Sequence, residues 1–229
     1  MKIERLEILF ENKTLVDISL DIKNSLALVG QSGSGKSLTL KALLGMLPSS
    51  MSCDLKLDGD FDLIAGDTVA FVPQNPFTAL SPLTKIGKQF FISKDKQKEL
   101  FKSVGLDAEL LDRFPPELSG GQLQRVVIAM SLESKPKLLL LDEPTTALDP
   151  ETRVLILNLL RELQLELGFK ILFVTHDMNA AKNLCEDICV IKDGKVIENG
   201  KMSQLLAQPK EEYTKILIQA NFSNRKFRV

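Results

Sequence analysis

The segment Gly30–Ser37, GQSGSGKS, restricts the fold of this chain more than any other. It contains three glycines, three serines and one lysine, and it stands between the apolar run SLALV and LTLKALLGML, which has helical spacing. Glycines in such a turn let several backbone N–H groups point at one place, and the following helix adds the positive end of its dipole. A strand, a glycine turn and a helix in this order indicate an α/β fold with a site for an anion.

The same segment matches GxxxxGK[ST] in the required strand–loop–helix context, so it predicts phosphate binding rather than a merely flexible turn. Lys36 is expected to reach the β- and γ-phosphates, and Ser37 to ligate Mg²⁺. The predicted phosphate-binding residues are Gly30, Gln31, Ser32, Gly33, Ser34, Gly35, Lys36, Ser37 and Leu38.

Hydrophobic periodicity places the remaining elements around this loop. Two alternating runs before residue 22 predict strands, and later strands alternate with helices, which indicates a largely parallel sheet with helices on both faces. Strand signals vanish between 75 and 135. We therefore expect one domain over 1–229, with an α/β core at 1–74 and 136–229 and a helical subdomain at 75–135. The helix after the glycine loop is expected to reach about Leu47 and to stop at Pro48.

An acidic pair follows the apolar run KLLLL at 137–141. After a phosphate loop, Asp142 is expected to hold Mg²⁺ through water, and Glu143 to polarise the attacking water. Taken alone, two acids at the end of a strand indicate an ordinary turn about as often as a catalytic pair. The preceding loop makes the catalytic interpretation the better one.

Three further features are ambiguous when each is taken alone. Ser119, Gly120 and Gly121 begin a helix in LSGGQ, which predicts either a second anion-binding concavity or an ordinary helix cap. His176, the only histidine, follows the buried run ILFV and is more often a simple turn residue. Gln74 after TVAFVP carries no signal of its own.

The overall composition excludes several other classes of protein. The formal net charge of −1 gives no strong field toward nucleic acid or anionic lipid. The apolar runs are a handful of residues, whereas a membrane-spanning helix needs roughly 20, and the N-terminus lacks a signal peptide. We therefore expect a cytosolic protein that reaches a membrane only through another chain.

The three cysteines indicate neither a disulfide framework nor a zinc site. Cys185 and Cys189 lie four residues apart, which leaves open a weak metal-pair alternative, although two thiols make only half a site. The simpler interpretation is that both are small buried apolar side chains.

Taken together and in order, GQSGSGKS, Gln74, LSGGQ, LLLLDEPTTALD and His176 resemble the ATP-binding-cassette (ABC) ATPases over nearly the whole chain. The resemblance implies a P-loop NTPase with a mainly parallel core, an N-terminal antiparallel β part and an inserted helical subdomain. It also implies ATP and Mg²⁺ as cofactors, and a second cassette facing this one head to tail.

The resemblance assigns roles to the ambiguous residues. His176 would bond to the γ-phosphate and position water, while Gln74 would join the helical subdomain to the Mg²⁺ site. Phe10 would stack on adenine. The family's usual Gly-Glu turn is replaced by a shorter one with Asn24, a residue that tolerates left-handed backbone. The residues implied to act on the partner's ATP are Ser119, Gly120, Gly121, Gln122 and Asp149.

Finer similarities concern the transported substrate. QNPFTALSPL and EEYTKILIQA resemble segments of peptide- and nickel-importer ATPases, whereas SGSGKSLTLKALLGMLP and LQRVVIAMSL resemble nickel-importer ATPases of the D type. The sequence stops at Val229 without the C-terminal cysteine cluster of many longer peptide-importer relatives. The resemblance therefore implies nickel import, with di- or oligopeptide import as the alternative and remodelling of nucleic acid or ribosomes as a third interpretation.

The implied partners follow from this interpretation. They are a second, non-identical cassette or a second copy, integral membrane permease subunits and, indirectly, an extracytoplasmic binding protein, with no nucleic acid. The implied location is the cytoplasmic face of the membrane.

Overall fold

A computed structural model describes residues 1–223, and the chain forms two compact units. One unit contains Met1–Leu63 together with the chain from Lys170 onward, and the other contains Ile64–Phe169. The second unit thus extends beyond the expected helical subdomain at 75–135, because it also holds two strands and a long helix.

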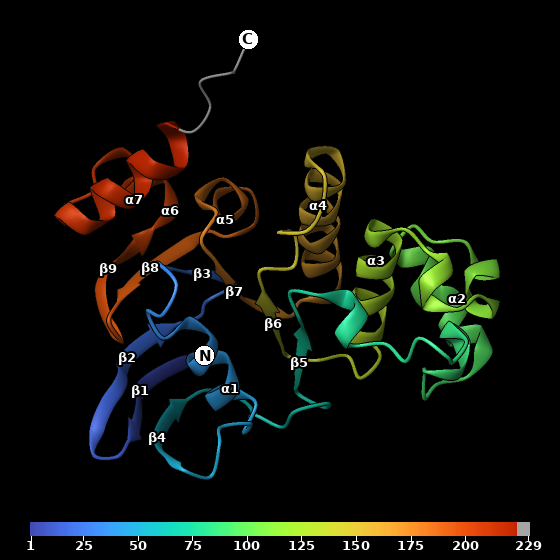
Figure 1. Cartoon of the computed structure of the whole chain (residues 1–229), viewed down its shortest axis with the longest axis horizontal. Coiled ribbons are helices and arrows are strands. Elements are labelled where there is room, and N and C mark those ends of the chain that lie inside the picture. The colour runs from blue at the N-terminus through green and yellow to red at the C-terminus, as the bar shows by residue number, and fades with distance from the viewer. Residues whose placement is uncertain (224–229) are drawn as a thin grey trace. The chain divides into compact units, whose positions relative to one another are not determined.

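The first unit is built on a seven-strand arrangement in the order β4-β1-β2-β9-β8-β3-β7 (Figure 1). Its N-terminal part is antiparallel, as expected, because β1 pairs with both β2 and β4. In the remaining part β3 pairs in parallel with β7 and with β8. The strands are β1 (Lys2–Phe10), β2 (Lys13–Asp21), β3 (Ser25–Val29), β4 (Met51–Asp58), β7 (Lys170–Thr175), β8 (Asp187–Lys192) and β9 (Lys195–Lys201).

Burial along these strands follows their place in the sheet. All five residues of β3 are buried, which is typical of a strand with neighbours on both edges and helices on its faces. By contrast, β2 alternates buried and exposed positions over most of its length, so only one of its faces is covered. The central position of β3 holds the phosphate loop at the end of a rigid strand.

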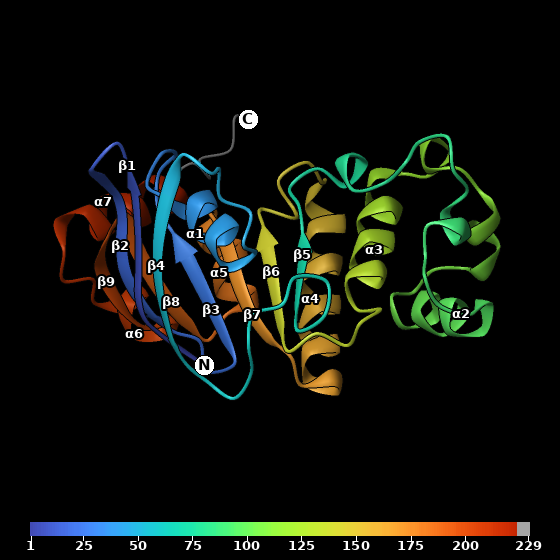
Figure 2. The ribbon, with the colours of Figure 1, turned by 90° about the horizontal axis from the view of Figure 1, so that it is seen from below.

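Four helices belong to the first unit. Helix α1 packs against β1 (Figure 2), while α6 and α7 pack against β9 and α5 packs against β3 and β7. Their bounds are α1 (Lys36–Leu43), α5 (Met178–Leu184), α6 (Met202–Ala207) and α7 (Glu212–Ser223).

Two details of this unit correct the expectations. Helix α1 ends at Leu43, before the expected Leu47, because Gly45 adopts a φ of 66° and its N–H bonds back to the Ala42 carbonyl. Asn24 is absent from the positive-φ residues within 1–223, so the turn before β3 closes without left-handed backbone there. The Asn24 carbonyl instead accepts a bond from the Ile171 N–H.

The second unit combines a parallel strand pair with helices. Strands β5 (Val69–Val72) and β6 (Leu138–Asp142) pair in parallel, with Val69 opposite Leu138 and Val72 opposite Leu141. Between them the chain is helical, as expected, and α3 packs against β5, α2 and α4 (Figure 2). The helices are α2 (Lys94–Ser103), α3 (Gly120–Ser131) and α4 (Pro150–Leu167), with the 3-10 turns η1 (Pro76–Thr78), η2 (Ile86–Lys88), η3 (Ala108–Asp112) and η4 (Pro115–Glu117).

Candidate functional site

Strand register brings the phosphate loop and His176 to the same edge of the first unit. Val29 at the end of β3 lies opposite Thr175 at the end of β7. Gly30 and His176 are the next residues of these two parallel strands, and both therefore leave the sheet at its carboxyl edge, where α/β folds place their ligands. His176 is exposed there.

Glycine is required in the loop for reasons of space as well as conformation. Gly35, which precedes α1, has a φ of 104°, and a Cβ at this position would lie 2.8 Å from Val16 Cγ2. At Gly30 a Cβ would lie 2.2 Å from the Ile191 carbonyl oxygen. The loop is therefore tightly packed against β2 and β8, which fixes the path of its backbone.

The loop holds the lysine ammonium against its own backbone. Lys36 is buried, and its Nζ donates to the carbonyl of Gly30 at 2.7 Å and to that of Gln31 at 2.9 Å. The hydroxyl of Ser34 is also buried and lacks a hydrogen-bond partner. A loop with a fixed cation and an unsatisfied hydroxyl donor fits the phosphates of a nucleotide. Exposed Ser37 lies at the second position of α1.

The acids and Gln74 lie together at the carboxyl edge of the strand pair in the second unit. Gln74 follows β5 by two residues, and Glu143 directly follows β6. The Gln74 Nε2 donates to Glu143 Oε2 at 3.4 Å, and the Thr146 hydroxyl donates to the same oxygen at 3.0 Å. The sequence motifs do not identify Thr146 as a functional residue. Its position three residues after Glu143 is nevertheless a spacing at which a threonine hydroxyl can reach a nearby group.

Glu143 also has an unusual backbone. Its φ is 45°, a left-handed conformation that glutamate seldom adopts. Strained residues of this kind collect at functional sites, where surrounding contacts hold them. Gln74 and Thr146 thus hold the Glu143 carboxylate in place. The preceding residue, Asp142, carries a carboxylate, which is a ligand type suited to Mg²⁺.

The signature segment LSGGQ forms a helix cap. Ser119 Oγ accepts from the Gln122 N–H at 3.2 Å, and Gln122 Oε1 accepts from the Ser119 N–H at 2.9 Å. This reciprocal capping box starts α3 as expected. The serine hydroxyl still has its own proton to donate, so the cap and an anion site are compatible.

Asp149 lies near the signature because α3 and α4 approach closely. Asp149 Oδ1 accepts from the Thr152 N–H at 3.0 Å, which caps α4, and this backbone bond lowers the pKa of the Asp149 carboxyl. A Cβ at Gly121 would lie 2.5 Å from Thr152 Cγ2, so any larger residue would force the Thr152 side chain to move. A cavity of about 450 Å³ opens here, lined among others by Ser119, Gly121, Gln122, Arg125 and Thr152.

Phe10 ends β1 at a tight hairpin. Glu11 and Asn12 form the turn with φ values of 48° and 62°, and Phe10 pairs with Lys13 across it. Two residues before Phe10, Ile8 pairs with Val16, the residue that contacts Gly35 of the phosphate loop. The hairpin is thereby positioned beside the loop in the first unit.

The two buried cysteines occupy a different part of the first unit. Cys185 is 5% exposed and Cys189 is 1% exposed, and burial raises the pKa of the Cys185 thiol and raises that of Cys189 to about 12. The expectation of small buried side chains is confirmed. Within residues 1–223 no group of three or more His, Cys, Asp or Glu residues is arranged to hold a metal ion.

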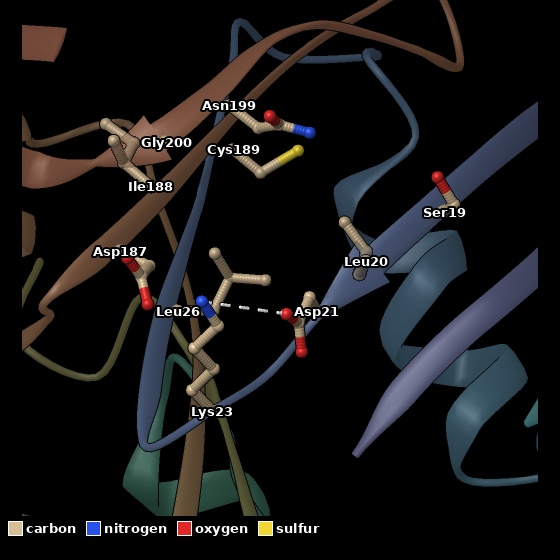
Figure 3. Close-up of a pocket in the computed structure, with 10 residues that line it drawn as sticks. All are labelled: Ser19, Leu20, Asp21, Lys23, Leu26, Asp187, Ile188, Cys189, Asn199 and Gly200. Atoms are coloured by element: carbon tan, nitrogen blue, oxygen red, sulfur yellow. Dashed lines mark ion pairs between the residues drawn. The ribbon is translucent and has the colours of Figure 1, made fainter. Parts of the chain in front are cut away.

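Figure 3 shows the cavity that Cys189 lines. It measures about 170 Å³ and opens where β2 and β9 diverge beyond their one paired position, Asp17 opposite Lys195. Lys23 and Asp21 form an ion pair at 4.0 Å on its wall. None of the predicted nucleotide-site residues lines this cavity.

Comparison with known families decides the class of protein. The family model described as ABC transporter matches residues 15–146, more than half of the chain. The chain belongs to the ABC transporter ATP-binding family. A second model, of an AAA domain, matches residues 113–181 of this cassette.

Several curated relatives of the cassette are named for peptide transport. The oligopeptide transport ATP-binding protein OppD of Bacillus subtilis is 35% identical, with 87% of this chain and 63% of the relative covered. The dipeptide transport ATP-binding protein DppF of Haemophilus influenzae is 34% identical, with 90% and 68% covered. YejF of Escherichia coli, 36% identical, is covered over 48% of its length, so the cassette spans about half of some relatives.

Solved structures confirm the cassette fold. CbiO1 of Clostridium perfringens, described as part of the ABC transporter complex cbiONQ, has a TM-score of 0.76 at 28% identity, with 97% of this chain and 95% of that chain covered. A dimeric cassette bound to ADP and phosphate after hydrolysis has a TM-score of 0.70 at 28% identity, with 88% and 99% covered. No helix within 1–223 has the length and apolar character needed to cross a membrane.

Proposed function

We propose that this cassette is the ATP-hydrolysing subunit of an importer for di- or oligopeptides, acting at the cytoplasmic face of a membrane. The peptide assignment is supported mainly by the relatives, since OppD and DppF carry names of peptide transport. These relatives favour import of peptides over import of nickel. Nickel import is what the finer sequence similarities implied.

The chain's own residues account for each step of the proposed hydrolysis. Lys36 would exchange the carbonyls of Gly30 and Gln31 for phosphate oxygens, with Ser34 as a further donor. ATP supplies the anhydride bond that is cleaved, Mg²⁺ would neutralise charge on its phosphates, and Ser37, Asp142 and Gln74 would hold the metal ion. Phe10 would stack on the adenine ring.

Glu143 would accept a proton from the attacking water, because its carboxylate is aimed by Gln74 and Thr146. His176 would hold the γ-phosphate from the neighbouring strand end. Ser119, Gly120, Gly121, Gln122 and Asp149 would act on the nucleotide of a second cassette. That second cassette, a membrane permease and an extracytoplasmic binding protein complete the proposed importer.

Uptake measurements test this proposal. Cells lacking the gene are complemented with wild type, Lys36→Ala or Lys41→Ala, and uptake of a labelled tripeptide and of labelled Ni²⁺ is followed. Lys41 is a matched control, because it is an exposed lysine on the same helix α1. Tripeptide uptake should return with wild type and Lys41→Ala but not with Lys36→Ala. If the wild-type gene restored Ni²⁺ uptake but not tripeptide uptake, the peptide assignment would be overturned, while the proposed ATP hydrolysis would stand.

A further inference from the structure

Helix α7 contacts the phosphate loop through a tyrosine. The Tyr213 hydroxyl accepts a hydrogen bond from the Gln31 N–H at 3.2 Å, across 182 residues of sequence. The carbonyl of Gln31 in turn accepts from Lys36 Nζ at 2.9 Å. A single loop residue, Gln31, thus connects Tyr213 to the lysine that is expected to bind phosphate.

The tyrosine ring is itself held in place. Lys192 Nζ lies 5.1 Å from the centroid of the Tyr213 ring, a cation–π distance. Lys192 ends β8, and two residues later Gly194 donates its N–H to the Ser34 carbonyl of the phosphate loop at 3.0 Å. The β8–β9 turn therefore supports both Tyr213 and the loop that Tyr213 contacts.

The other end of α7 contacts the segment after His176. Asn221 Oδ1 accepts from the Met178 N–H at 3.1 Å, while Asn221 Nδ2 donates to the Leu217 carbonyl at 3.0 Å. Met178 is fully buried and begins α5, two residues after His176. Tyr213 and Asn221 are eight residues apart, so they lie two turns apart along one side of the helix, about 12 Å in rise.

The start of α7 is anchored independently of these two contacts. The Glu198 carboxylate of β9 accepts from the N–H groups of Lys210 and Glu211 at 3.0 and 3.2 Å. Burial opposes ionisation of Glu198, but these N–H donors hold its pKa below the usual value. The helix therefore has a fixed base from which Tyr213 and Asn221 reach the two loops.

We propose that Tyr213 and Asn221 are positioning residues for ATP turnover, with α7 tying the Lys36 loop to the His176 loop. The proposal rests on ATP binding at the phosphate loop, as proposed above. Tyr213 would act through Gln31 on Lys36 and so on nucleotide affinity. Asn221 would act through Met178 on His176 and so on the rate of hydrolysis.

Conservative variants separate this role from simple packing. Tyr213→Phe removes only the hydroxyl acceptor and keeps the ring under Lys192. Because one hydrogen bond contributes about 0.5–1.5 kcal/mol, binding of Mg²⁺ with a non-hydrolysable ATP analogue should weaken about 2- to 10-fold. Calorimetry on the full chain measures this. Lys215→Ala, which removes an exposed side chain of the same helix that forms a surface ion pair with Glu212, should leave the affinity unchanged.

Asn221 is tested by a different readout. Asn221→Ala should lower kcat about 2- to 10-fold with the KM for ATP unchanged, whereas Asn221→Asp keeps an acceptor for Met178 and should retain most of the rate. Melting temperatures are recorded for every variant. Equal affinity in wild type and Tyr213→Phe, or equal losses of rate in Asn221→Ala and Lys215→Ala, would overturn the inference. A wild-type chain that does not bind the analogue would overturn the proposed ATP binding as well.

Discussion

Glu143 combines left-handed backbone with a carboxylate held by two donors. Glu143→Gln keeps the size of the side chain but removes its ability to accept a proton. We expect kcat to fall about 10²- to 10⁴-fold with ATP affinity retained, because general-base catalysis is lost while phosphate contacts remain. Steady-state ATPase assays and ATP binding measure this. Glu151→Gln, an exposed acid in the first turn of α4, is the matched control. Wild-type turnover by Glu143→Gln would refute the base assignment.

The three cysteines differ in exposure and therefore in reactivity. Burial raises the pKa of all three thiols, and the neighbouring Asp54 adds to the effect at Cys53, so the thiolate, which is the reactive form, is disfavoured at each. Access of the reagent therefore distinguishes them, because Cys53 is exposed on β4 whereas Cys185 and Cys189 are buried. A thiol reagent at pH 8 should label one cysteine in the native chain and all three after unfolding in denaturant. Cys53→Ser should abolish the native reaction. Native labelling of Cys189 in that variant would show that the cavity in Figure 3 admits solvent and reagent.

At the scale of elements, glycines fix where helices and hairpins end. Gly168 ends α4 with a φ of 74° and has open space around it, whereas Gly194 has a φ of 75° and a Cβ there would lie 2.0 Å from the Leu15 carbonyl oxygen. Gly168→Ala should therefore cost about 1–2 kcal/mol of the free energy of unfolding, the cost of left-handed backbone alone. Gly194→Ala should cost more, because it adds a clash with β2.

Denaturant unfolding of both variants measures this difference. Gly168→Asn is the control for Gly168→Ala, since asparagine adopts left-handed backbone more readily and should be less destabilising. If Gly168→Ala and Gly194→Ala lowered the free energy of unfolding equally, β2 would have moved away from the β8–β9 turn without loss of stability.

At the scale of the whole molecule, the proposed function requires a second cassette, whose signature segment would complete the site. The related cassette structure bound to ADP and phosphate is dimeric. We expect the ATPase activity per chain to rise with protein concentration, and Glu143→Gln to dimerise when ATP is added. Gel filtration with light scattering, with and without ATP, checks this. Full activity from a demonstrated monomer would contradict the two-cassette mechanism.

The sequence by itself determined the features that depend on a few neighbouring residues. The phosphate loop, the Ser119 and Asp149 caps, and the hairpin turn at Asp193 and Gly194 all follow from short spacings, because their hydrogen bonds close within a few residues. The ABC family followed from the order of such motifs. The end of α1 was mispredicted, because Gly45 terminates the helix before Pro48 can.

Only the tertiary structure decided which distant residues meet. The contact of Gln74 with Glu143 depends on the register of β5 against β6, and the close approach of Gly121 to Thr152 depends on how α4 packs on α3. Tyr213 gives no local signal of its bond to Gln31, since 182 residues separate them. Such contacts arise from packing of whole elements, where a side chain's role depends on its neighbours in space rather than on its neighbours in the chain.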